Sequence, residues 1–143
     1  MSRILRGTAA GAAYLDLQKA ARASGRPTDE LIQLYILEGF LARLVVSPLR
    51  EVFVLKGGML LAAFGDRRPT RDVDLAARDL SNDVLAVLDA VSSVVATQLS
   101  VDDGIEFQPA SATAEIVRED DEYSGGARWT RCPTGARSGA VSC

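Results

Sequence analysis

Apolar residues recur at helical spacing in three separate stretches of the chain. The first stretch spans residues 8–23 and ends before Gly25, and the second spans residues 29–46 and ends before Pro48. A third apolar stripe follows Ser81, which we expect to cap its helix. The members of this stripe are Val84, Val87, Leu88, Val91 and Val95. The hydrophobic pattern therefore predicts three helices.

Two short segments of a different kind lie between the second and third predicted helices. Residues 52–56 ("VFVLK") are rich in β-branched and aromatic residues, and residues 71–77 ("RDVDLAA") alternate between polar and apolar. The segment between them begins with Gly57-Gly58 and continues as a short apolar helix over residues 59–64. The order of these elements predicts an α+β fold.

The sequence changes character towards its C-terminal end. A turn over residues 102–104 precedes two more predicted strands, residues 105–107 and 112–117. From residue 125 onward there is no acidic residue and no Leu, Ile or Phe. We therefore expect one folded domain over residues 1–124 and a disordered tail over residues 125–143.

Composition restricts the chemistry that this chain can perform. It contains no histidine, which excludes Ser-His-Asp and Cys-His catalysis and histidine-ligated zinc. Its two cysteines, Cys132 and Cys143, do not have metal-ligand spacing. The formal net charge of −3 gives no overall basic signature of nucleic-acid binding. Acid–base or metal chemistry must therefore rest on carboxylates, lysine or hydroxyls.

The apolar runs also bear on where the protein acts. None of them approaches the length of a membrane span. Arg6, Thr8 and Asp16 interrupt the N-terminal region, so it lacks the continuous apolar core of a signal peptide. We expect a cytoplasmic protein without a membrane partner.

The paired glycines are a candidate phosphate site. Between a strand and a helix, Gly57 and Gly58 allow a ligand to approach the backbone, whose N–H groups favour anions there. Lys56 directly precedes them and is within reach of a bound triphosphate. By itself, such a glycine pair is more often only a turn. Lys56 is equally well explained as a strand-end lysine whose stem covers apolar surface.

The second candidate feature is an acidic pair. Asp72 and Asp74 fall on one face of the predicted strand, and two such carboxylates can bind Mg²⁺, which prefers oxygen ligands. An isolated pair is more often a solvated edge strand. Arg67, Arg68 and Arg71 precede the pair and would neutralise phosphate charge, or belong to a solvated turn. In combination, the glycines, arginines and aspartates predict a nucleotide and metal site.

The combined stretch resembles a known family. "FVLKGGMLL" followed by "RPTRDVDL" is similar to the AbiEii/AbiGii nucleotidyltransferase toxins of toxin–antitoxin and phage-defence systems. These toxins belong to the DNA polymerase β-like superfamily, and the resemblance covers about residues 10 to 125. It implies a polymerase β-like nucleotidyltransferase core in which helices flank a mixed sheet.

The resemblance also implies roles for particular residues. Asp72 and Asp74 would be the catalytic pair that holds Mg²⁺. The nucleotide-binding residues would be Lys56, Gly57, Gly58, Arg68 and Arg71. The implied partners are a nucleoside triphosphate, an acceptor such as the 3′ end of tRNA, and a cognate antitoxin protein.

The chain departs from the family in two respects. Family members continue with a further strand carrying a third acid and with a helical C-terminal half, whereas the similarity here stops after Tyr123. We therefore expect a core that is incomplete at its C-terminus, with weak stability and little or no transfer by this chain alone. Gly39 also stands where the family often has a larger residue, and a mid-helix glycine costs about 1 kcal/mol.

Two other functions compete with a nucleotidyltransferase toxin. One is a catalytically inactive remnant that binds nucleotide or antitoxin. The other is an unrelated α+β domain in which the glycines and aspartates are structural. The specificity of the combined motif disfavours this last alternative.

Overall fold

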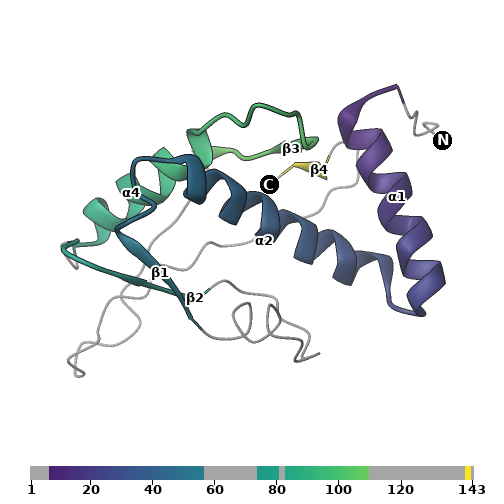
Figure 1. Ribbon diagram of the computed structural model, residues 1–143, viewed down its shortest axis with the longest axis horizontal. Helices are drawn as coiled ribbons and strands as arrows, with labels where there is room; N and C mark the ends of the chain where they lie inside the picture. The colour runs from purple at the N-terminus through teal and green to yellow at the C-terminus, as the bar shows by residue number, and fades with distance from the viewer. Residues whose placement is uncertain (1–6, 57–73, 81–82, 110–140, 143) are drawn as a thin grey trace.

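The computed structural model describes residues 7–56, 74–80, 83–109 and 141–142 (Figure 1). Within these ranges the chain forms three helices and two sheets of two strands each. The predicted α+β class is confirmed. The polymerase β-like core stays a prediction, and the elements expected over residues 59–64 and 112–117 lie outside the described residues.

The first helix, α1 (Ala9–Ser24), has a distinct signal at each end, and the one at Gly25 was expected from the sequence. The hydroxyl of Thr8 accepts a hydrogen bond of 3.0 Å from the Gly11 N–H, which would otherwise be an orphan donor of the first turn. At the other end Gly25 takes the left-handed conformation, with φ at 68°. The predicted helix over residues 8–23 is confirmed to within one residue at each end.

The second helix, α2 (Thr28–Val46), begins one residue earlier than predicted. Pro27 precedes it with φ at −60°, and no side chain caps its first turn. Asp29 and Glu30 lie in that turn, where the positive end of the helix dipole favours acids. The helix ends because Pro48 excludes the helical conformation at Ser47, whose ψ is 158°.

The third helix in the described ranges is α4 (Val84–Ala96), and here the predicted cap was wrong. Asp83, not Ser81, is the N-cap, and its carboxylate accepts a hydrogen bond of 3.2 Å from the Ala86 N–H. An N-cap side chain accepts from a backbone N–H two or three residues further along the helix, and Asp83 lies three residues before Ala86. Ser81 itself lies outside the described residues.

The predicted apolar stripe of α4 is partly confirmed. Val95 is buried as expected, and the other buried positions are Ala90 and Val94. Val94 is fully buried, whereas Leu85 at the start of the helix is largely exposed. Leu85 is not a member of the predicted stripe. The stripe's other four members are half-buried, and they are Val84, Val87, Leu88 and Val91. The inward face therefore includes the predicted stripe and, in addition, Ala90 and Val94.

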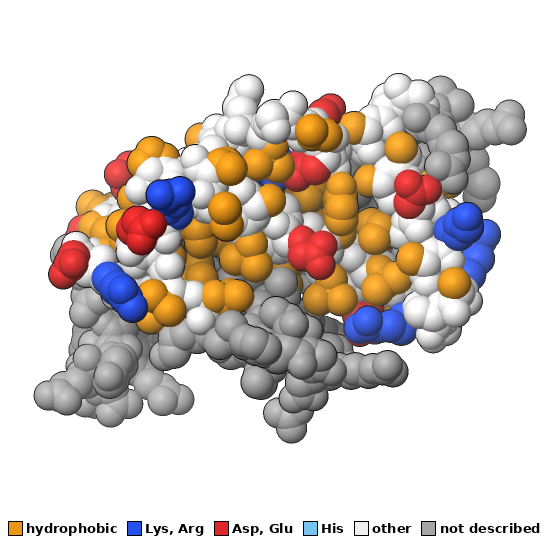
Figure 2. Space-filling view, in the orientation of Figure 1, with side chains coloured by type: hydrophobic (Ala, Val, Ile, Leu, Met, Phe, Trp, Pro, Cys, Tyr) orange, Lys and Arg blue, Asp and Glu red, His pale blue; other side chains and the backbone are white. Residues whose placement is uncertain are grey.

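Helix α2 is the central element of the described structure. It lies between α1 and α4 in Figure 1 and contacts both of them. Ile36 of α2 packs with Ile32 and with Phe107 from the segment after α4. Figure 2 shows hydrophobic side chains gathered across the face where α2 runs. This helix therefore connects the other two helices and the segment that carries Phe107.

Four short strands complete the described structure. β1 (Phe53–Lys56) pairs with β2 (Asp74–Ala77) in the antiparallel direction. β3 (Ile105–Glu106) pairs in parallel with β4 (Val141–Ser142). β4 belongs to the segment that we predicted to be a disordered tail. The rest of residues 125–143 lies outside the described ranges, and the division of the chain at residue 124 stays a prediction.

The bend before β3 brings the backbone very close to the start of α1. Gly104 has φ at +74°, and a Cβ there would lie 2.5 Å from both the N and the Cα of Ala10. The Asp102 carboxylate stabilises the bend by accepting a 2.9 Å hydrogen bond from the Gly104 N–H. Only glycine satisfies both the dihedral angle and the close approach.

We predict that Gly104→Ala lowers the free energy of unfolding by at least about 2 kcal/mol, because strain in the left-handed region adds to overpacking against Ala10. Gly25→Ala is the matched control, since Gly25 has a similar φ of +68° with no atom within 4 Å of the added Cβ. It should lose only about 1 kcal/mol. Urea denaturation measures both values, and equal losses would contradict the close approach.

Candidate functional site

The β1–β2 ladder brings two of the predicted site residues opposite one another. β-branched and aromatic residues favour the extended backbone of β1, and the alternating sequence of β2 pairs with it. The aligned Cα pairs are Phe53 with Ala77, Val54 with Ala76, Leu55 with Leu75, and Lys56 with Asp74. Lys56 and Asp74 thus form the last pair at one end of the ladder.

The same register determines how the motif is joined to the ladder. Gly57-Gly58 follows Lys56 in the sequence, and Asp72-Val73 precedes Asp74. The segment over residues 57–73 therefore leaves and rejoins the ladder at the same end. Five predicted site residues lie outside the described part of the chain: Gly57, Gly58, Arg68, Arg71 and Asp72.

The chemistry of this end of the ladder suits a phosphate and a hard cation. Lysine supplies a positive charge and aspartate supplies carboxylate oxygens, which are the ligands that Mg²⁺ prefers. Among the described residues no three carboxylates or thiolates come together as a metal site. Asp74 is thus the only member of the predicted acidic pair at a described position, and its donor type fits a divalent ion.

A second polar cluster lies on α2, away from the predicted site. Arg43 donates two hydrogen bonds to the Asp103 carboxylate, at 2.7 Å and 3.0 Å. It also donates to the carbonyl oxygens of Gly39 and Ile105, at 2.9 Å and 3.2 Å. The guanidinium carbon lies 4.9 Å from the centre of the Phe107 ring. Arg43 therefore fastens the segment around β3 to α2.

Electrostatics within this cluster favour the charged form of Asp103. Burial by itself would raise the pKa of the Asp103 carboxyl group. The hydrogen bonds from Arg43 and from the Ile105 N–H, together with the positive charge of Arg43, outweigh burial and lower that pKa below its ordinary value. Arg43 is only 7% exposed, and Asp103 supplies the counter-charge that its buried guanidinium requires.

Tyr35 belongs to the same cluster and joins it through the backbone. Its hydroxyl donates a hydrogen bond of 2.6 Å to the carbonyl oxygen of Asp103. Burial and the nearby Asp103 charge raise the pKa of Tyr35, and the Arg43 charge opposes them. The phenol is therefore neutral at physiological pH and remains a hydrogen-bond donor.

Comparison with protein families gives a match over residues 39–140, to the family described as "Nucleotidyl transferase AbiEii toxin, Type IV TA system". The chain belongs to the AbiEii family. It is thus a nucleotidyltransferase toxin of a toxin–antitoxin system by family membership. No curated protein and no solved structure matched the chain in the corresponding searches.

The AbiEii match covers most of the features described above, although it begins after Tyr35, and it extends to residue 140, beyond Tyr123, where we expected the similarity to stop. Lys56, Asp74, Arg43 and Asp103 all lie within it, whereas α1 lies outside. Family membership implies a divalent metal, a nucleoside triphosphate and an antitoxin. In the described parts of the chain, no helix combines the length and the apolar character that crossing a membrane requires.

Sequence reasoning missed the Arg43–Asp103 cluster because its partners are far apart in the sequence. Two local signals pointed towards it. Arg43 interrupts the apolar run at the C-terminal end of α2, and Gly39 lies one turn before it. A Cβ at Gly39 would collide with the Ile105 side chain and lie 3.3 Å from the Asp103 carboxylate. The mid-helix glycine is thus explained by the close approach of the β3 segment.

We predict that Asp103→Asn lowers the free energy of unfolding at pH 7 by about 3 kcal/mol, because it leaves the buried Arg43 charge without a counter-charge. Asp102→Asn is the matched control, since asparagine keeps the oxygen that accepts from the Gly104 N–H. That variant should behave almost as the unmodified chain. Urea denaturation at several pH values measures the difference.

The pH dependence of this loss follows from the direction of the pKa shift. Because folding lowers the pKa of Asp103, its contribution is complete above the unfolded pKa of about 3.9 and disappears as the pH falls through the folded pKa. The difference between Asp103→Asn and the unmodified chain should therefore shrink from about pH 5 towards pH 2. A constant difference over this range would contradict the ion pair.

Proposed function

We propose that this chain transfers a nucleotide from a nucleoside triphosphate to a hydroxyl acceptor, such as the 3′ end of a tRNA. The observation that carries the proposal is the pairing of Lys56 with Asp74 at the end of the β1–β2 ladder. The segment between them carries the glycines, the arginines and Asp72. Membership of the AbiEii family supports the same chemistry.

The nucleotide-binding half of the proposed site consists of backbone and positive charge. The N–H groups of Gly57 and Gly58 would bind the triphosphate, because glycine allows a phosphate to approach the backbone closely. Lys56 would neutralise one phosphate as a point charge. Arg68 and Arg71 would each bind phosphate oxygens with two parallel hydrogen bonds. Together they hold the nucleotide with its α-phosphate towards the aspartates.

The acidic half of the proposed site consists of Asp72 and Asp74. Their carboxylates would hold Mg²⁺, which when bound lowers the pKa of an attacking hydroxyl and offsets the charge that develops on the phosphate. The cation would also offset the repulsion between the carboxylates and the triphosphate, since all of these groups are negatively charged. The register that places Asp74 beside Lys56 thus sets the position of both halves.

The proposed reaction is an in-line displacement at the α-phosphorus. The acceptor oxygen forms a new bond to that phosphorus while the bond to the bridging oxygen of the β-phosphate breaks. Pyrophosphate leaves with the electron pair of the broken bond, and the acceptor hydroxyl gives up its proton to solvent water. Catalysis therefore depends on positioning and on charge neutralisation, which are the contributions that these residues can make.

The proposed partners follow from this reaction and from the family. A cognate antitoxin would counter the toxic activity. A cytoplasmic location is proposed because nucleoside triphosphates and tRNA are found there. A chain that bound nucleotide without transferring it would correspond to the alternative, an inactive nucleotide- or antitoxin-binding remnant.

We predict that the purified chain, given Mg²⁺, total tRNA and each α-labelled nucleoside triphosphate in turn, transfers label to RNA. This prediction departs from the sequence-based expectation of little or no transfer by this chain alone, because the family match extends to residue 140, beyond the point where that expectation ended the similarity. Asp74→Ala should lower this transfer by roughly 100-fold or more, because several kcal/mol of charge stabilisation are lost. Label retained on RNA after denaturing electrophoresis measures the activity.

The control for that experiment is Asp89→Ala. Asp89 is an exposed aspartate of α4, so its removal changes the net charge equally without touching the ladder. Equal activities of the two variants would count against the assigned role of Asp74. Retention of nucleotide with no labelled RNA or protein for any of the four nucleotides would exclude transfer and favour the binding-only alternative.

A further inference from the structure

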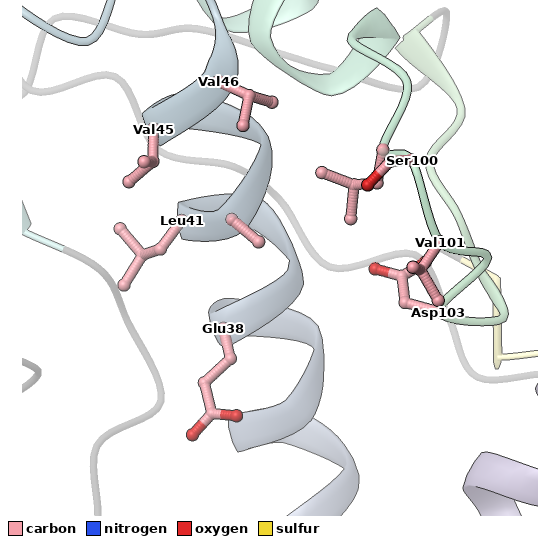
Figure 3. Close-up of a pocket in the computed structure, with 9 residues that line it drawn as sticks. Glu38, Leu41, Val45, Val46, Ser100, Val101 and Asp103 are labelled. Atoms are coloured by element: carbon pink, nitrogen blue, oxygen red, sulfur yellow. The ribbon is translucent and has the colours of Figure 1, made fainter.

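An open apolar groove lies between the C-terminal half of α2 and the segment that follows α4. Its volume is about 620 Å³ (Figure 3). One wall is formed by four side chains of α2, and Leu99 and Val101 lie across from them. The four α2 residues are Leu41, Ala42, Val45 and Val46. None of these groove residues belongs to the predicted nucleotide site.

Three of the apolar side chains that line the groove are largely exposed to solvent. Val45, Val46 and Val101 are 64%, 60% and 74% exposed. Single exposed apolar residues are common on proteins, whereas a contiguous group around a groove marks a surface that binds another molecule. The three valines therefore indicate a docking surface.

The α2 wall has the geometry that receives a helix. Leu41 and Val45 are four residues apart, as are Ala42 and Val46, so the two pairs form parallel ridges along α2. Ridges of this spacing pack against the ridges of a second helix. The segment carrying Leu99 and Val101 closes the other side of the groove (Figure 3). An amphipathic helix lying along α2 would cover both walls.

Charge decides between possible occupants. The ionisable residues that line the groove are both acidic, Glu38 and Asp103. Arg43 already pairs with Asp103, which leaves Glu38 as the charge that an occupant would meet. Glu38 lies at one end of the α2 wall in Figure 3. A second copy of this acidic surface, or an anionic membrane, would be repelled, whereas a lysine or arginine would be attracted.

We propose that this groove docks an amphipathic helix of a partner protein. The helix presents apolar residues at positions i, i+3 or i+4, and i+7 to the groove. A lysine or arginine at the edge of its apolar face pairs with Glu38. The partner is thus a basic amphipathic helix, which is a different ligand from the nucleotide and its acceptor.

The test measures binding of a fluorescein-labelled 15-residue Leu/Lys amphipathic helix to the full chain by fluorescence anisotropy. Val46→Gln should weaken binding roughly tenfold, because one buried valine contact is lost. Glu38→Gln should weaken it roughly threefold, because an exposed charge pair contributes less. Leu85→Gln is the matched control, since Leu85 is 71% exposed and lies on α4 outside the groove. It should bind the peptide as the unmodified chain does.

Two further peptides separate groove binding from general attraction to an acidic protein. One has glutamate in place of each lysine, and the other has the same composition in scrambled order. Both should bind at least roughly tenfold more weakly than the Leu/Lys helix. Equal binding of the scrambled peptide, or equal weakening by Leu85→Gln and Val46→Gln, would overturn the proposal.

The other possible occupants give distinct results, each of which would overturn it. A dimer of the unmodified chain that dissociates in Val46→Gln would assign the groove to a second copy. Binding to anionic phospholipid vesicles that is lost in Val46→Gln would assign it to a membrane. A much lower melting temperature for Val46→Gln than for Leu85→Gln would show that the chain itself covers the groove.

Discussion

The antiparallel hydrogen bonding between β1 and β2 is the constraint on which the proposed site depends. It aligns Lys56 with Asp74, although the whole of residues 57–73 separates them in the sequence. A shift of one residue would move every side chain of one strand to the other face and remove this pairing. The two halves of the motif thus become one site only through the register. Either half alone is better explained as an ordinary turn or a solvated strand. The alignment of Lys56 with Asp74 is therefore stronger evidence for the proposed site than the residue types alone.

Helix α2 holds the segment around β3 through contacts of two kinds. Apolar contacts connect Ile36 with Phe107, and the ion pair between Arg43 and Asp103 fastens the same segment. A buried pair of this kind contributes more to a unique arrangement than to net stability, since desolvation offsets much of its attraction. Two glycines permit the close approach that the pair requires, one within α2 and one in the bend before β3. The same helix leaves its C-terminal apolar ridges uncovered, and these form the groove.

The parts of the fold that depend on local chemistry could be predicted from the sequence. Gly25 and Pro48 each set a helix end through interactions within a few residues, and both were identified correctly, whereas Thr8 was placed inside the helix that it caps. The cap of α4 was misassigned because both Ser81 and Asp83 are good capping residues, and only the helix start distinguishes them.

Long-range pairings could not be predicted in this way. The Arg43–Asp103 contact and the β3–β4 pair join residues whose proximity no local pattern encodes. For the candidate site, the sequence predicted which residues would bind nucleotide and metal. The structure adds that two of them, Lys56 and Asp74, are aligned across the β1–β2 pair.

Cross-linking of engineered cysteines tests the alignment of Lys56 with Asp74 most directly. In a background in which Cys132 and Cys143 are replaced by serine, one protein carries Lys56→Cys with Asp74→Cys and a second carries Lys56→Cys with Leu75→Cys. Directly opposite Cα atoms in an antiparallel pair are about 4.5–5.5 Å apart, within the range that a disulfide spans, whereas neighbouring positions on a strand face opposite sides. The described register predicts that mild oxidation links 56 to 74 and leaves 56 and 75 reduced, as seen by mass spectrometry. Equal linkage in both proteins, or linkage of 56 to 75 alone, would contradict the alignment on which the proposed site rests.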